Sequence, residues 1–170
     1  RLVGSEMCIR DSRQIKNPTI GLPERIFEFI SSNTPLVNVD LLIKNPKNPK
    51  EILLTWREDQ FYKGWHIPGG IIRFKETAEF RVRKVAEIEL RTTLKTISGP
   101  IYISEKINTA RCIRGHFVSL LYKCSIDGKL NPKLEYTKEK TPKPGEWKWF
   151  SEVPNDFLVQ QSQYKKYFQI

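Results

Sequence analysis

Cysteine and histidine, the side chains that most often bind zinc, are scarce in this chain. It has three cysteines, Cys8, Cys112 and Cys124, and two histidines, and no cysteines form a Cys-x-x-Cys pair. This pattern argues against a zinc site and against a disulfide framework. Because a chain without disulfides is typical of a reducing compartment, we expect a cytoplasmic protein.

Long apolar runs are also missing. No run approaches the ~18 residues of a membrane-spanning helix, so we expect no membrane partner. Apolar residues make up 39% of the 170 positions, which is enough for a buried core of one domain. The opening stretch, RLVGSEMCIRDS, resembles translated sequencing-adapter sequence. We therefore treat residues 1–13 as a non-native leader and expect a single domain over residues 14–170.

Negative charge is the scarcer sign, since 19 acidic residues stand against 29 basic residues and the net charge is +10. This excess is compatible with an anionic partner such as a nucleotide, and also with a lysine-rich solvated surface, which the even spread of lysines favours. Blocks of like charge and RRM or KH patterns are absent, so we do not expect nucleic acid as the partner. An RNA-binding domain is a third alternative that only the net charge supports.

The hydrophobic pattern predicts an α+β fold with one central helix. Helices are expected over residues 22–33 and 76–90, with closing helical turns after residue 153. Strands are expected over residues 36–44, 51–57, 100–107, 115–125 and 146–150. The first two strands are expected to form a hairpin, and residues 58–75 a loop.

A paired glycine and two spaced glutamates stand out in the middle of the chain. Gly69 and Gly70 let the backbone turn and expose a carbonyl, which is the kind of oxygen ligand that Mg²⁺ prefers. Glu76 lies near the start of the predicted helix and Glu89 near its end. Each residue alone is compatible with a tight turn or a solvated helix charge. Together, at this spacing, they indicate a phosphate-and-metal site.

These positions resemble the Nudix hydrolases, whose signature is G-x5-E-x7-R-E-U-x-E-E-x-G-U, where U is a bulky aliphatic residue. Gly70, Glu76 and Glu89 match it strictly, whereas Val85 and Ile88 replace two acidic residues. The resemblance implies a Nudix-type α/β/α sandwich, with a mixed central sheet and the helix of the signature packed on it.

The sequence is most similar to the GDP-mannose mannosyl hydrolases, whose signature also lacks those two acids. The stretches TPLVNVDLLIKN, WREDQFYKGWHIPGG and EWKWFSE carry this resemblance. It implies that the backbone of Gly69 and the carboxylate of Glu89 hold Mg²⁺. It also implies that water attacks the anomeric carbon of a nucleoside diphosphate sugar, that the nucleoside diphosphate leaves, and that the protein forms a homodimer.

The same resemblance suggests roles for further residues. Arg57 would bind the diphosphate and stabilise the leaving group, and Glu76 would orient the loop or the waters of the metal. Asp40 matches the aspartate of the family's first strand, at the substrate site. The family's arginine after the paired glycines is Ile71 here, with Arg73 as its candidate substitute.

The late loop departs from the family pattern. The place of the catalytic histidine is Pro144, and Lys143 stands where the glutamine ligand should be. The remaining candidates for a base are Glu139, Glu146, His66 and His116. Two hypotheses follow. One is an Mg²⁺-dependent hydrolase, with attack on phosphorus as a close variant; the other is a non-catalytic Nudix-fold module that binds a nucleotide sugar or another protein.

Overall fold

The computed structural model describes residues 15–137 and 140–169. The expected leader over residues 1–13 and the candidate Glu139 lie outside the described residues. The helical segments, with η marking 3₁₀ helices, are η1 (Pro18–Ile20), α2 (Glu24–Asn33), α3 (Ala78–Glu89), η2 (Pro132–Leu134) and η3 (Val159–Gln169). The strands are β1 (Leu36–Ile43), β2 (Ile52–Glu58), β3 (Lys63–His66), β4 (Gly69–Ile71), β5 (Leu94–Ile107), β6 (His116–Ile126) and β7 (Trp147–Phe150). No helix in the described part of the chain is both long and apolar enough to cross a membrane.

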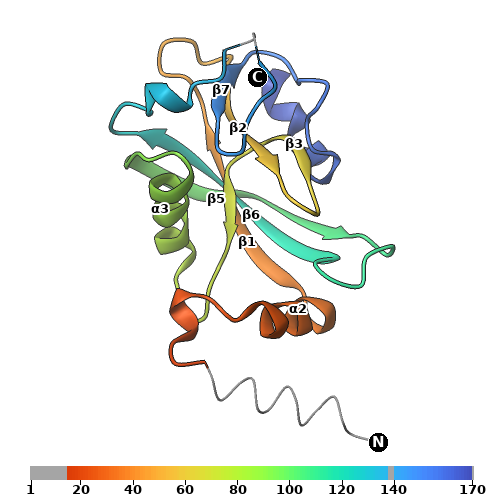
Figure 1. Cartoon of the computed structure of the whole chain (residues 1–170). Helices are drawn as coiled ribbons and strands as arrows, with labels where there is room; N and C mark the ends of the chain where they lie inside the picture. Colours follow the sequence, from red (N-terminus) through yellow and green to blue (C-terminus); the bar gives the residue numbers. More distant parts are fainter. Residues whose placement is uncertain (1–14, 138–139, 170) are drawn as a thin grey trace, which may run out of the picture.

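The strands form two sheets (Figure 1). The first has the order β4-β1-β6-β5, in which β1 runs parallel to β6 and the other neighbours are antiparallel. The second is antiparallel throughout and has the order β3-β2-β7. The predicted α+β class and the predicted mixed sheet are therefore confirmed.

The predicted hairpin of the first two strands is wrong. β1 lies between β4 and β6, whereas β2 lies between β3 and β7 in the other sheet. The two strands meet at an isolated bridge between Lys44 and Ile52, beside the turn. β1 cannot take β2 as a neighbour because both of its edges are already hydrogen-bonded, one of them to a parallel strand that is distant in sequence. The expected loop over residues 58–75 likewise contains β3 and β4.

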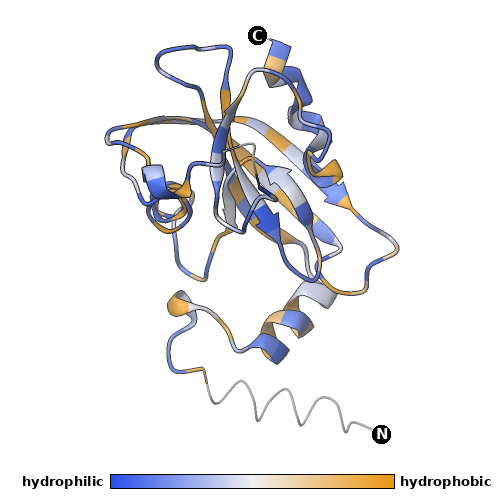
Figure 2. Cartoon of the chain, turned by 45° about the horizontal axis from the view of Figure 1, so that its top comes forward, coloured by the Kyte–Doolittle hydropathy of each residue, from blue (hydrophilic) through white to orange (hydrophobic). Residues whose placement is uncertain are grey.

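Helical segments pack on both sides of the sheets, as the predicted sandwich requires. α3 inserts Val82, Val85 and Ala86 into one hydrophobic core, together with residues of β1, β5 and β6. The C-terminal η3 inserts Tyr164 and Phe168 into a second core, together with residues of β2 and β3. Figure 2 shows hydrophobic residues along the central strands and mostly hydrophilic residues in the connecting loops, in agreement with these cores.

The boundaries of α3 follow from local capping. The side chain of Thr77 accepts a hydrogen bond from the N–H of Phe80, which satisfies a free donor of the first turn. At the other end Leu90 closes the helix, and Arg91 adopts a left-handed φ of 53° that stops further helix. The helix expected over residues 76–90 is thus confirmed, and its last helical residue is Glu89.

Candidate functional site

β4 brings the paired glycines beside the end of α3. It is an edge strand that pairs antiparallel with β1, with Gly69 opposite Asp40. Its backbone bonds to β1 use alternate positions such as Pro68 and Ile72, so the N–H and C=O of Gly69 point away from β1. The N–H of Gly69 lies close enough to the Glu89 carboxylate to act on it, and it lowers the pKa of that carboxyl. The structure therefore places the Gly69 backbone and the Glu89 carboxylate side by side.

Both glycines occupy positions where a side chain would collide. A Cβ on Gly69 would clash with the Asp40 carboxylate, and a Cβ on Gly70 would lie 2.8 Å from Cγ2 of Val85. Their absence of a side chain lets β4 pass closely between β1 and α3. Val85, which stands where the signature has an acid, is a core residue with 3% exposure. Its apolar character is therefore explained by packing.

Glu89 is half-buried, and among the described residues none is seen in an ion pair with it. Burial raises the pKa of its carboxyl to about 8, and the negative charge of Asp40 also raises it, whereas Arg57 and the Gly69 N–H act in the opposite direction. At neutral pH the group favours binding a proton. A bound cation would displace that proton, because metal ligands must be deprotonated.

Asp40 on β1 is held by the C-terminal segment. It is 3% exposed and accepts hydrogen bonds from the Tyr164 hydroxyl at 2.7 Å and from Nε2 of Gln161 at 3.3 Å. Burial raises the pKa of this carboxyl to about 6, against the effect of the hydrogen bonds. Gln161 also accepts from the N–H of Ile67 at 2.7 Å and donates to its C=O at 3.1 Å. η3 therefore closes the side of the site formed by β1 and β3.

Arg57 on β2 lines a cleft of about 400 Å³ together with Asp40, Gly69 and residues of the β5–β6 connection. Its Nε donates to Oδ2 of Asp59 at 2.7 Å, and its guanidinium lies 4.6 Å from the centre of the Tyr62 ring. About a third of the side chain is exposed. The structure thus brings Arg57, Asp40 and Gly69 to one cleft, with the guanidinium of Arg57 partly exposed.

A second cavity of about 580 Å³ lies on the α3 side of β4 and shares Gly69 and Gly70 with the cleft. Glu89 lines it, together with Val85 and Ile88 at the two positions where the signature has acids. Glu89 therefore lies between the cleft that Asp40 and Arg57 line and a second cavity in which apolar side chains replace two acids of the signature.

Glu76 and Arg73 do not face the cleft. The Glu76 carboxylate accepts a hydrogen bond from Nε of Arg81 at 2.8 Å, and the two side chains are 8% and 7% exposed. Burial acts to raise the pKa of Glu76, but the hydrogen bond from Arg81 leaves it lowered overall. Glu76 also accepts from the N–H of Arg73 at 2.9 Å, which fixes the turn before α3. Arg73 lines the second cavity, and its Nη1 donates to the C=O of Thr19.

Neither histidine is free to act as a base beside Glu89. Nδ1 of His66 lies 2.8 Å from the C=O of Ile67, so it carries the ring proton, and Nε2 accepts from the Thr55 hydroxyl at 3.2 Å. Burial, followed by the charge of Arg57, lowers the pKa of His66 to about 4. The ring is therefore neutral with both nitrogens bonded. His116 lies at the start of β6, with Nε2 2.8 Å from Oε1 of Glu105.

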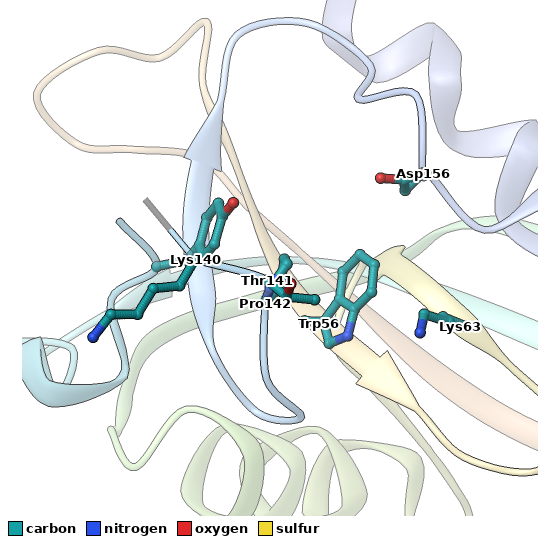
Figure 3. A pocket seen from close by; sticks show the side chains of 7 residues that line it. Trp56, Lys63, Lys140, Thr141, Pro142 and Asp156 are labelled. Carbon is teal, nitrogen blue, oxygen red and sulfur yellow. The ribbon is translucent and has the colours of Figure 1, made fainter. Parts of the chain in front are cut away.

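The described part of the late loop borders a different hollow. Thr141 and Pro142 line this hollow together with Trp56 (Figure 3). Trp56 and Arg57 are adjacent in β2, so their side chains point to opposite faces of the strand. This hollow of about 660 Å³ is also lined by Lys63 and Asp156. Further along the loop, the Glu146 carboxylate accepts a hydrogen bond from the N–H of Lys143 at 2.9 Å. These described positions therefore line neither the cleft nor the second cavity.

The residues beside β4 fit a single hard cation. The described residues contain no group of three or more His, Cys, Asp or Glu side chains placed to hold a metal. Glu89 and the outward-facing backbone of Gly69 nevertheless supply oxygen donors on one side. Mg²⁺ commonly takes one or two carboxylates from the protein and fills its remaining positions with water and substrate phosphates.

Several residues at the site were not predicted from the sequence. Tyr164 and Gln161 reach Asp40 from the far end of the chain, and only the tertiary structure shows this contact. Arg111 and Arg114 line the cleft from the loop between β5 and β6. In the sequence, only their position in a loop between two predicted strands could have suggested a binding role.

Comparison with known proteins adds a family match to this geometry. The family model described as the NUDIX domain matches residues 34–165. The low-salt glycan biosynthesis protein Agl8 of Haloferax volcanii is 29% identical over 119 residues, which cover 67% of this chain and 74% of that protein.

Solved structures share the fold at low sequence identity. A MutT NUDIX hydrolase from Burkholderia pseudomallei has a TM-score of 0.61 and 19% identity, covering 81% of this chain and 98% of that one. The NUDIX domain of Shewanella oneidensis NrtR, crystallised with ADP ribose, has a TM-score of 0.51 and 19% identity, covering 69% of this chain and 73% of that one. These likenesses agree on an α/β/α sandwich.

Proposed function

Because this chain belongs to the NUDIX domain family, we propose that it is a hydrolase of a nucleoside diphosphate sugar, releasing the sugar and the nucleoside diphosphate. Two similar proteins support this substrate class. Agl8 is named for glycan biosynthesis, and the NrtR domain was crystallised with ADP ribose, in which a diphosphate also joins a nucleoside to a sugar. A GDP-mannose-like substrate is the specific form of the proposal.

The observation that carries the proposal is the proximity of the Gly69 backbone and the Glu89 carboxylate beside the cleft that contains Arg57. A carboxylate held against an outward-facing backbone is suited to a cation. A guanidinium in the adjoining cleft is suited to a phosphate, which it can bind through two parallel hydrogen bonds. A diphosphate placed between the two features would have positive charge on both sides.

We propose Mg²⁺ as the cation, held by the Glu89 carboxylate and the Gly69 carbonyl. When bound, Mg²⁺ would stabilise negative charge on the diphosphate. Arg57 would orient the diphosphate and stabilise the leaving group, since the planar fork of a guanidinium matches phosphate oxygens. Asp40, fixed by Tyr164, would contact the substrate from the floor of the cleft.

In the proposed reaction, water adds to the anomeric carbon and the bond from that carbon to the diphosphate oxygen breaks. The electron pair leaves with the nucleoside diphosphate, and the water loses one proton, so the products are free sugar, nucleoside diphosphate and a proton. Glu76 would not contact these reacting atoms; its role would be to position the backbone. It orients the turn after β4 through its bonds to Arg81 and to the Arg73 N–H.

The alternative is a module that binds a nucleotide sugar or a protein without turnover. A specific observation favours it, because both ring nitrogens of His66 are engaged and the described late loop lies away from the cleft. A binding module would keep the cationic cleft and would not require a base.

The experiment is a product analysis in water enriched in ¹⁸O. The protein is incubated with GDP-mannose and Mg²⁺, and the products are resolved by mass spectrometry. Labelled mannose and unlabelled GDP support the proposal, whereas label in mannose phosphate or GMP indicates attack on phosphorus. Thermal stabilisation by GDP-mannose without any product supports the binding module.

We propose a homodimer in the cytoplasm, and light scattering of the purified protein measures the oligomeric state directly. A mass of one chain at assay concentrations would contradict the dimer without affecting the proposed reaction.

A further inference from the structure

Three arginines gather around one aromatic ring in the cleft. The guanidinium carbons of Arg57, Arg111 and Arg114 lie 4.6, 4.8 and 5.8 Å from the centre of the Tyr62 ring. All three side chains line the cleft. Such stacking supplies some stabilisation, but three like charges at this range repel one another. The arrangement therefore favours an anion that neutralises them.

The structure supplies little counter-charge of its own. Arg57 is paired with Asp59, but in residues 15–137 and 140–169 neither Arg111 nor Arg114 forms an ion pair with a carboxylate. Arg114 is half-buried, and its Nε has no hydrogen-bond partner within the described chain. A buried guanidinium N–H without a partner is costly. A ligand oxygen in the cleft would satisfy it.

The loop that carries the two arginines is preorganised. The N–H of Asn108 donates to the C=O of Gly115 at 2.6 Å, and the N–H of Arg111 donates to the C=O of Asn108 at 3.1 Å. Arg114 adopts a left-handed φ of 54°, which non-glycine residues rarely adopt and which costs free energy. The loop holds this conformation with the guanidinium turned to the cleft. Little ordering is then needed when a ligand binds.

We propose that Arg111 and Arg114, together with Arg57, form a clamp for two adjacent phosphoryl groups. This inference rests on the proposed function and names the residues that recognise the diphosphate of its substrate. Planar guanidinium groups match phosphate oxygens through paired hydrogen bonds, which gives both affinity and orientation. A diphosphate offers oxygens on two adjacent groups, which would contact Arg57 on β2 and the two arginines of the β5–β6 loop.

The test measures binding of GDP and GMP by calorimetry in the presence of EDTA, so that no metal contributes. Arg114→Asn removes the charge with little strain, because asparagine accepts left-handed backbone well. We expect GDP affinity to fall about tenfold or more, as for the loss of a charge-assisted hydrogen bond, and GMP affinity to fall less. Arg114→Lys should retain part of the GDP affinity.

The matched control is Arg83→Gln, which removes one positive charge from the exposed face of α3, where Arg83 pairs with Glu79. We expect it to bind GDP as the unmodified chain does. Thermal melting of each variant verifies folding. Arg111→Lys serves as a second probe, since Nη2 of Arg111 also donates to the C=O of Phe61 and full truncation would alter the loop.

The outcomes separate the clamp from the reaction. If GDP-mannose is hydrolysed but folded Arg114→Asn binds GDP as tightly as the unmodified chain, the clamp is wrong and the proposed function stands. If GDP binding weakens selectively in the variant and no substrate is hydrolysed, the clamp stands and the proposed function fails. An unmodified chain that does not bind GDP overturns the clamp.

Discussion

The backbone N–H of Gly69 lies beside the carboxylate of Glu89 and acts to lower the pKa of that carboxyl. The two residues come from an edge strand and from the end of α3, and the site depends on this contact. It places a carboxylate with a raised pKa beside backbone oxygen that is not used by the sheet. A hard cation needs such a pair of oxygen donors.

Replacing Glu89 tests this contact directly. Glu89→Gln keeps the shape of the side chain but removes the charge that would hold a cation. We expect Mg²⁺ affinity to fall by at least the roughly 10–100-fold that metal-site substitutions commonly cause, and any Mg²⁺-dependent turnover to fall with it. Glu87→Gln is the control, because Glu87 is 63% exposed and pairs with Lys84 on the solvent side. Equal Mg²⁺ binding by both variants would contradict the metal assignment.

Adding a methyl group at Gly69 should disturb the packing of β4 against β1 through a steric clash. A Cβ there collides with the Asp40 carboxylate, so β4 must shift away from β1. We expect Gly69→Ala to lower the free energy of unfolding by about 1–3 kcal/mol, the usual cost of overpacking. Gly128→Ala is the comparison, since a Cβ there meets only the Thr92 side chain, at 3.3 Å. Denaturant titration of both variants measures the difference, and equal stability would rule out the predicted clash.

The pKa of Glu89 predicts a dependence of stability on pH in metal-free protein. The folded-state pKa of about 8 lies above the ordinary value of 4.5, so the native state binds more protons and stability falls as pH rises between these values. His66 has a lowered pKa of about 4, so its titration makes stability rise with pH, but only below its ordinary value of 6.5. Asp40, raised to about 6, acts mainly below that pH. From about pH 6.5 to 8, stability should therefore fall in the unmodified chain and stay flatter in Glu89→Gln, as denaturant titrations in EDTA would measure. Parallel curves would show that Glu89 does not titrate there.

The buried pair between Glu76 and Arg81 should contribute to stability. Glu76→Gln leaves the Arg81 charge without its partner, and breaking a buried pair costs about 3–5 kcal/mol. The exposed pair between Glu79 and Arg83 offers the control on the same helix, with side chains 61% and 55% exposed. Glu79→Gln should cost under about 1 kcal/mol. A Glu76 variant that keeps full stability but loses activity would favour a direct catalytic role instead.

The Tyr164 hydroxyl should hold Asp40 in place. Tyr164→Phe leaves a buried carboxylate with one donor fewer, and an unsatisfied buried group costs about 1–3 kcal/mol. Tyr167→Phe is the control, because Tyr167 lies on the same segment and makes ring contacts without a bond to Asp40. Thermal melts compare the two variants. Identical stability would show that the bond from Tyr164 contributes nothing.

Local pattern was sufficient for several features of this protein. The helix α3 and the strands β1, β2, β6 and β7 could all be predicted from the sequence. Each depends on spacing along the chain and on intrinsic preferences, which do not require knowledge of distant neighbours. The mixed sheet was expected from the family resemblance, and the structure confirms it.

Only the tertiary structure decided which residues share the site. It separated β1 from β2, placed Glu76 and Arg73 outside the cleft, and brought Tyr164 to Asp40 from 124 residues away. It also turned Arg111 and Arg114 toward Arg57. Strand order and register set these contacts, and they arise from burial summed over the whole chain rather than from any one segment. For this reason the kinds of residue needed at the site could be recognised in the sequence, whereas their grouping into one cleft could not be predicted from it.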